Sequence, residues 1–136
     1  MNIIFLSPHL DDAVLSCGAI LYDLIHKQHH TVEVWTLFSG DVPPGPLSPF
    51  AAELHQRWNT GLEAPKARRA EDKLACERLG VEPHYLMLPD CIYRLRQGTN
   101  LPLIEKNDDL FNLPLETESS LIQDLGQKLT NTLPAD

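Results

Sequence analysis

Hydrophobic positions in the first forty residues change from a continuous run to a helical spacing and back again. Residues 2–6 are almost wholly apolar, which is typical of a strand covered on both faces in a parallel sheet. From residue 13 to about 27, apolar side chains recur every three or four positions, which predicts a helix with one buried face. These positions are Val14, Cys17, Gly18, Leu21, Leu24 and Ile25. Residues 31–38 are rich in β-branched and aromatic side chains and predict a second strand, completing a right-handed βαβ unit.

A long loop and two helices are expected next. Residues 39–50 carry two glycines and four prolines, which predicts a loop leaving the carboxyl end of the second strand. A short helix is predicted over residues 51–58, and a stronger one over 65–79, with Gly80 as its C-cap. We expect small and apolar side chains to form the inward stripe of this second helix: Ala67, Ala70, Leu74 and Leu79.

The remaining residues predict one more strand and one more helix. Residues 84–88 form the strand, 91–117 are irregular, and 118–130 form a helix with leucine and isoleucine on one side. Together the elements predict an α/β fold: a Rossmann-like three-layer α/β/α arrangement with a mostly parallel sheet. The chain is expected to be a single domain over residues 1–136, with its sheet truncated after three strands.

Composition narrows the class of protein. A chain of 136 residues with 43% hydrophobic and 22% charged residues is expected to be one soluble globular domain. Its net charge of −8 argues against nucleic acid or an anionic membrane surface as a partner. No apolar run is long enough to span a membrane, and no signal peptide precedes the first strand. Three widely spaced cysteines, without a C-x-x-C pair, predict a reduced, cytoplasmic protein.

The stretch between the first strand and the first helix carries the most chemistry. His9, Asp11 and Asp12 lie where ligands bind in open α/β sheets, outside the carboxyl end of a strand. One imidazole and two carboxylates suit zinc, and adjacent aspartates on a bending loop diverge. One can therefore bind the metal while the other acts as general base. The alternative is that both aspartates only cap the helix. The position of His9, two residues before Asp11 and just after an apolar strand, favours the metal site.

Residues 8–13 (Pro-His-Leu-Asp-Asp-Ala) resemble the P-H-P-D-D-E signature of zinc-dependent N-deacetylases, the LmbE-like or PIG-L family. Residues 68–72, followed by Ala75 and Leu79-Gly80-Val81, resemble the R-x-x-E helix of that family. Leu88-Pro89-Asp90 and Tyr93-Arg94 resemble the segment after its third strand. The resemblance covers residues 1 to about 95.

The resemblance implies roles for six residues. His9 and Asp12 would be ligands of Zn2+, or of another divalent metal, and Asp11 the general base. Water activated at the metal would attack an acetamide carbonyl, and Asp11 would pass its proton to the departing amine. The implied substrate is an N-acetylated amino sugar, such as N-acetylglucosamine, or its conjugate. The candidate substrate-binding residues are Arg68, Arg69 and Arg94. For Arg68 and Arg69, an ordinary surface salt bridge is the alternative.

The sequence departs from the family pattern in two ways. Leu10 and Ala13 replace the proline and glutamate of the signature, although neither is an implied ligand. The third ligand of the family, a histidine in an H-x-x-H-like stretch after a fourth strand, has no counterpart. Among the other histidines, only His55 follows a strand at the edge of the sheet where His9 lies, which makes it a candidate third ligand. The alternative is that His55 only packs in the fold.

The missing histidine leaves several interpretations open. The simplest is that the chain is the N-terminal portion of a longer deacetylase, whose open sheet edge a homo-oligomer would cover. A catalytically inactive, degenerate metal-binding domain of the same fold is the main alternative. A magnesium-binding phospho-receiver would use Asp11, Asp12 and Asp90 but would leave His9 without a role. A dinucleotide-binding domain is disfavoured because no G-x-G-x-x-G follows the first strand.

Overall fold

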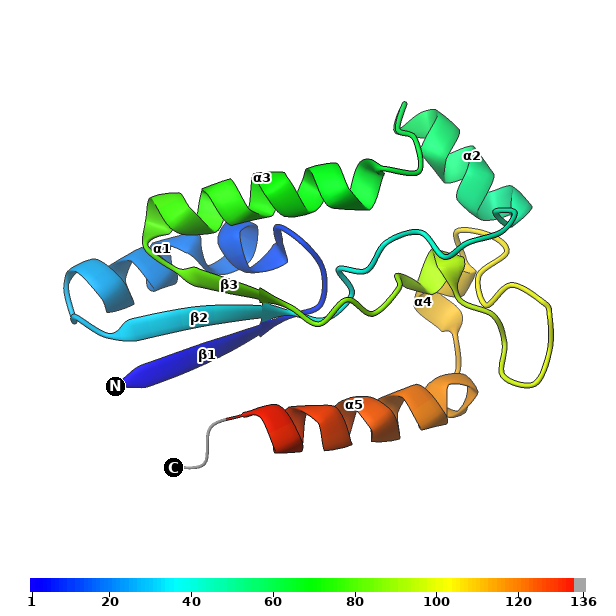
Figure 1. Cartoon of the computed structure of the whole chain (residues 1–136). Helices are drawn as coiled ribbons and strands as arrows, with labels where there is room; N and C mark the ends of the chain where they lie inside the picture. Colours follow the sequence, from blue (N-terminus) through cyan, green and yellow to red (C-terminus); the bar gives the residue numbers. More distant parts are fainter. Residues whose placement is uncertain (134–136) are drawn as a thin grey trace.

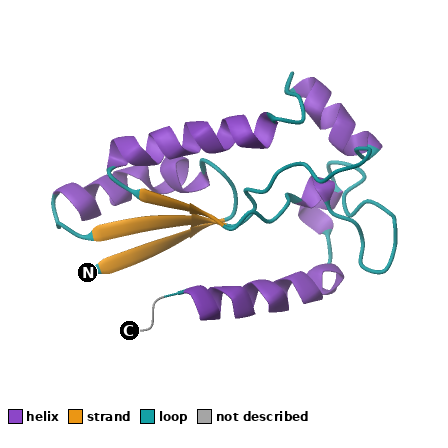
Figure 2. Ribbon diagram, viewed as in Figure 1, coloured by secondary structure: helices purple, strands orange, loops and turns teal. Residues whose placement is uncertain are grey.

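A computed structural model describes residues 1–133 as three layers, with a small parallel sheet in the middle and helices on both sides (Figure 1). The strands, in spatial order, are β1 (Asn2–Ser7), β2 (Thr31–Thr36) and β3 (Glu82–Tyr85). Two helices cover one face of the sheet, and a third lies on the other side (Figure 2). They are α1 (Asp12–His26) and α3 (Ala64–Leu79) on the first face, and α5 (Ser119–Thr132) on the second. The predicted three-layer α/β class is therefore confirmed.

The main core lies between the sheet and the two helices of the first face. Leu21 of α1 is fully buried against Val32 and Val34 of β2, so the predicted apolar face of α1 is the one that packs. Most of the stripe predicted for α3 is wrong, because Ala67, Ala70 and Leu74 are exposed. The helix instead buries Asp72 and Cys76, and the charge at Asp72 hid this face from the hydrophobic pattern.

A second apolar cluster supports the loops at the carboxyl end of the sheet. It joins α2 (Pro49–Arg57) to the 3-10 helix η1 (Cys91–Tyr93). Its buried members are Phe50, Ala51, Leu54, Ile92, Leu103 and Ile104. The stretch predicted to be irregular, residues 91–117, also contains the short helix α4 (Asp109–Asn112) and the start of η2 (Leu115–Glu118). This cluster gives the long loops a packed base of their own.

The third strand begins and ends earlier than the sequence pattern predicts. It runs from Glu82 to Tyr85 rather than over residues 84–88. The chain keeps two hydrogen bonds to the β2 side beyond that point, Leu86 N–H to Thr36 O and Leu88 N–H to Leu37 O. Met87 has a positive φ of 58°, which turns the backbone out of the ladder.

The sheet is open along the outer edge of β1. Within residues 1–133, no further strand pairs with that edge, and Leu6 is 49% exposed. In the same part of the chain, no helix combines the length and apolar character needed to cross a membrane. Cys17, Cys76 and Cys91 are free thiols, as the scattered cysteines predict.

Gly40 allows the loop after β2 to touch the segment after β3. Its N–H donates to Leu88 O, and a Cβ there would lie 2.6 Å from the Met87 carbonyl oxygen. Because that obstacle is backbone, Gly40→Ala is expected to lower the free energy of unfolding by about 1–3 kcal/mol. Urea denaturation measures this. Gly61→Ala, where a Cβ meets nothing within 4 Å, is the matched control. Equal losses in both variants would contradict the steric explanation.

Candidate active site

The loop between β1 and α1 is shaped by the Ser7 hydroxyl. Ser7 is buried; its Oγ donates to His9 O at 2.9 Å and accepts from Ala13 N–H at 3.2 Å. Asp11 occupies the N-cap position in the left-handed region, with φ 71°, yet its side chain makes no capping bond. Asp12 accepts from the His9 N–H rather than from the helix. The alternative in which both aspartates only cap this helix is therefore not observed, because Ser7 accepts the Ala13 N–H instead.

His9 lies between two carboxylates from different elements. Its Nδ1 is 3.3 Å from Asp12 Oδ2, and its Nε2 is 3.6 Å from Asp90 Oδ2. Nitrogen and oxygen ligands of one tetrahedral zinc ion lie roughly 3.4 Å apart, since each is bound at about 2.1 Å. The His9–Asp12 pair therefore fits two positions of a zinc site. A carboxylate facing the second nitrogen of a metal-binding histidine, as Asp90 does, is a common arrangement in such sites.

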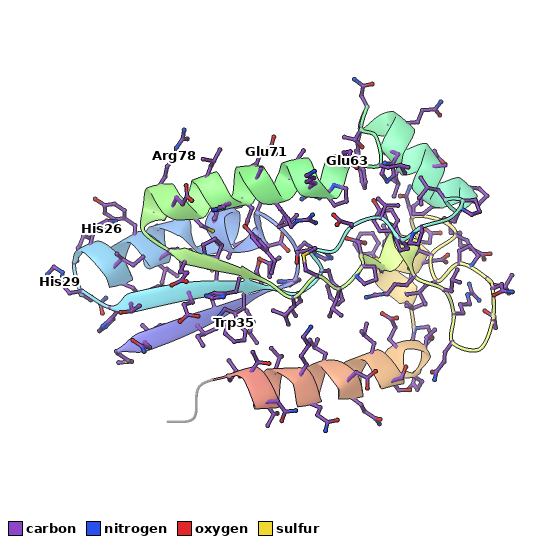
Figure 3. All side chains as sticks on the ribbon, viewed as in Figure 1. His26, His29, Trp35, Glu63, Glu71 and Arg78 are labelled. Carbon is purple, nitrogen blue, oxygen red and sulfur yellow. The ribbon has the colours of Figure 1, made fainter. Side chains whose placement is uncertain are left out.

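The third ligand is not supplied by the histidines that the structure describes. Across residues 1–133, no three His, Cys, Asp or Glu side chains form a group able to hold a metal. His55 is buried, and its Nε2 contacts the Tyr93 hydroxyl at 2.7 Å. His26 and His29 lie at the opposite end of the sheet from the His9 loop (Figure 3). The packing role considered for His55 is the one observed.

Asp11 is fixed by a buried carboxylate that the sequence analysis did not single out. Asp72 is 2% exposed, and its Oδ1 accepts the Asp11 N–H at 2.9 Å. Its Oδ2 accepts from the Tyr85 hydroxyl at 2.8 Å. Burial, followed by this bond to Asp72, raises the pKa of Tyr85 far above its ordinary value, so the hydroxyl remains a donor. The neighbouring Glu71, the acidic residue of the R-x-x-E resemblance, points outward from α3 (Figure 3).

Arg68 is the substrate-binding candidate that lies beside Asp11, the candidate general base. One of its Nη atoms is 3.5 Å from Asp11 Oδ2 and donates to Leu10 O at 3.5 Å. The side chain is 51% exposed, which leaves other donors of its guanidinium free. A bound carbonyl or hydroxyl group could therefore contact Arg68 without displacing Asp11.

Arg69 and Arg94 connect loops to the scaffold. Arg69 donates to Ser39 O at 2.6 Å and pairs with Asp41, so it holds the loop after β2 against α3. Arg94 pairs with Glu118, and its guanidinium carbon lies 4.8 Å from the centre of the Phe38 ring. Both side chains are largely buried. Of the three arginine candidates, only Arg68 is thus paired with a residue of the His9 loop.

A cavity of about 370 Å³ opens beside this loop. Arg68 and Asp90 stand on its wall, together with Leu10 from the loop itself. Aromatic side chains cover much of the remainder: Phe38, Trp58 and Tyr93. A mainly apolar wall with a few convergent polar groups is typical of a small-molecule site.

Removing the Asp72 carboxylate should test how far it supports the site. In Asp72→Ala, the Asp11 N–H loses its acceptor, and the Tyr85 hydroxyl keeps only its longer contact, 3.3 Å to Arg69 O. Each unsatisfied group costs about 1–3 kcal/mol when buried, so we expect the free energy of unfolding to fall by about 2–4 kcal/mol. Thermal and urea denaturation measure the change. Glu71→Ala, on the exposed face of the same helix, should change stability by less than about 0.5 kcal/mol. Similar losses in the two variants would refute this role.

Fold and site together define an α/β domain in which His9, Asp12 and Asp11 lie together outside the first strand. The chain belongs to the PIG-L family, described as GlcNAc-PI de-N-acetylase, which residues 4–131 match. Membership confirms the resemblance drawn from residues 8–13 and favours it over the phospho-receiver interpretation. A 2'-N-acetylparomamine deacetylase of Niallia circulans is 33% identical, over 96% of this chain and 54% of that protein.

Solved structures of deacetylases share the fold. A deacetylase in complex with teicoplanin superposes with a TM-score of 0.80 and 29% identity, over 95% of this chain and 52% of that one. A zinc-inhibited form of a teicoplanin deacetylase gives 0.75 and 28%, over 95% and 50%. The deacetylase of the A40926 pseudoaglycone gives 0.63 and 34%, over 95% and 46%. The chain thus spans about half the length of these relatives.

Proposed function

We propose that this protein takes part in zinc-dependent removal of an N-acetyl group from an amino sugar or its conjugate. One observation carries the proposal: His9 Nδ1 and Asp12 Oδ2 lie 3.3 Å apart, and the neighbouring Asp11 has a carboxylate that makes no capping bond to the helix. Relatives of the chain include deacetylases named for an acetylated aminoglycoside and for glycopeptides. We extend their type of substrate to this chain as part of the proposal.

His9 and Asp12 would hold the ion, with Asp90 facing the second nitrogen of His9. When bound, zinc polarises a carbonyl oxygen and lowers the pKa of a coordinated water to about 7. Another divalent ion that accepts imidazole and carboxylate ligands would serve in the same place. We propose that further ligands come from outside the described residues or from the solvent.

Asp11 is the residue suited to move the proton. Its carboxylate is partly exposed and free of the helix N-terminus, while its backbone is held by Asp72. It would take a proton from the attacking water and deliver it to the amine as the C–N bond breaks. Arg68, at 3.5 Å from Asp11, would contact the substrate. The amide thus becomes acetate and a free amine.

The second candidate function is a metal-binding domain of the same fold without catalysis. It is favoured by the lack of any three-residue metal-binding group within residues 1–133. Two protein ligands hold zinc weakly, so only a small fraction of the protein molecules would carry the ion at low zinc concentration. The two candidates agree on His9 and Asp12 and differ only in whether acetate is released.

Metal analysis and an acetate-release assay on the 136-residue chain would test the proposal. The chain is incubated with zinc and with the methyl glycoside of N-acetylglucosamine, and free amine and acetate are measured. We expect zinc-dependent release that a chelator abolishes and that Asp12→Asn reduces. Zinc binding without release would support the second candidate instead. Failure to bind zinc would refute both.

A further inference from the structure

His55 and Tyr93 form a polar pair that the proposed chemistry does not use. His55, on α2, is 6% exposed, and its ring lies near the rings of Trp58 and Tyr93. Its Nε2 is 2.7 Å from the Tyr93 hydroxyl of η1, whereas its buried Nδ1 has no partner. Tyr93 also lines the cavity beside the His9 loop. The pair therefore links a buried imidazole to the cavity wall.

The unpartnered Nδ1 of His55 indicates which tautomer of the imidazole is present. A proton on Nδ1 would be a buried, unsatisfied N–H group, which costs about 1–3 kcal/mol. With the proton on Nε2, only a lone pair is left unpaired, and the Nε2–H donates to the Tyr93 oxygen. The hydroxyl of Tyr93 then keeps its own hydrogen for another acceptor. Hydrogen bonding to His55 thus orients Tyr93 as a donor.

Tyr93 shares the wall of the cavity with two charged side chains. Burial, with a smaller contribution from Asp90, raises the pKa of its hydroxyl to about 12, and Arg68 opposes the change. Asp90 and Arg68 line the same cavity as Tyr93. With a pKa of this size, the hydroxyl remains protonated at neutral pH and can only donate or accept as a neutral group.

We propose that Tyr93 is a substrate-binding residue: its hydroxyl, oriented by His55, donates a hydrogen bond to an oxygen atom of a sugar held in the cavity. This rests on the proposed function, because the cavity ligand is taken to be an N-acetylated amino sugar. A site with a fixed donor discriminates in favour of ligands that offer an oxygen there, since an unmatched donor is left unpaired. His55 is a positioning residue that acts through Tyr93.

Binding of a defined glycoside to the whole chain tests the proposal. The probe is the methyl glycoside of N-acetylglucosamine, added to the 136-residue protein while the fluorescence of Trp58, on the cavity wall, is followed. Trp35 is 6% exposed and bonds to Glu33, so it should contribute a constant background. Tyr93→Phe is expected to weaken binding by about 3- to 10-fold, the value of one neutral hydrogen bond. Tyr22→Phe is the matched control: it removes the hydroxyl of an exposed tyrosine on α1 and should leave the affinity unchanged.

Variants of His55 separate orientation from packing. In His55→Gln the side-chain amide can still donate to Tyr93, so affinity should stay within about twofold of the wild type. His55→Leu fills the position with an apolar side chain that has no donor, and should show the same loss as Tyr93→Phe. Urea denaturation of each variant confirms that folded protein is compared. Nitrogen NMR of the His55 ring should show the proton on Nε2.

The outcomes distinguish this proposal from the deacetylase proposal. Tyr93-dependent binding without acetate release would support the role of Tyr93 and count against catalysis. Acetate release with unchanged affinity in Tyr93→Phe would overturn the role of Tyr93 alone. A proton on Nδ1 of His55, or no binding of the glycoside to the wild type, would also overturn it.

Discussion

Asp11→Asn is expected to slow N-acetyl hydrolysis by about 100- to 10,000-fold, the usual contribution of a positioned general base. Asparagine cannot accept the proton from the attacking water, but it fits the left-handed backbone at φ 71° as well as aspartate does. The fold should therefore be retained, and zinc binding should stay within a few-fold of the wild type, because His9 and Asp12 are unchanged. The measurements are acetate release at saturating zinc and zinc affinity on the same samples.

Asp108→Asn is the matched control for that substitution. Asp108 is an exposed carboxylate at the start of α4 and makes no capping bond from its side chain. Its amide variant should hydrolyse the glycoside at the wild-type rate. Full activity in Asp11→Asn would refute the assignment of the base. A loss of zinc in that variant would show that Asp11 acts as a ligand instead.

His9→Ala should remove most of the zinc binding of the chain. His9 supplies the one nitrogen of the donor pair, and Asp12 alone would leave a single described ligand. We expect the zinc affinity to fall by at least about 100-fold, which exceeds the loss seen when only a supporting residue is changed. Asp12→Asn should give a loss of similar size. Equilibrium dialysis with metal analysis measures both.

A second histidine provides the control for this loss. His29 is exposed at the far end of the sheet, and His29→Asn keeps a residue that tolerates its positive φ of 57°. Zinc affinity should not change in this variant. An equal decrease in His29→Asn and His9→Ala would mean that the chain binds zinc through scattered surface histidines.

Asp90 shows why part of the site could be predicted from order along the chain. Pro89 and Asp90 follow the third strand, and the carboxyl ends of parallel strands share one edge of the sheet. The predicted third strand therefore places Asp90 at the same edge of the sheet as His9. In the structure, Asp90 Oδ2 lies 3.6 Å from His9 Nε2. Its contact with the imidazole was not predicted, because strand order fixes an edge and not the direction of a side chain.

Asp72 shows what a linear pattern misses. It is 61 positions from Asp11, and its buried side chain accepts the Asp11 N–H. The R-x-x-E resemblance drew attention to Glu71, one position away and on the outer face of α3. Only a helical projection that includes Cys76, four residues later on the same buried face, would have favoured Asp72.

The sequence by itself determined the parallel α/β class, the apolar face of α1 and the grouping of His9, Asp11 and Asp12. These features depend on side-chain spacing over a few residues, which the backbone period of a strand or helix makes visible. Only the tertiary structure decided that Asp72 accepts the Asp11 N–H and that His55 contacts the Tyr93 hydroxyl rather than His9 or Asp12. Such contacts join distant segments through packing, so no local periodicity records them.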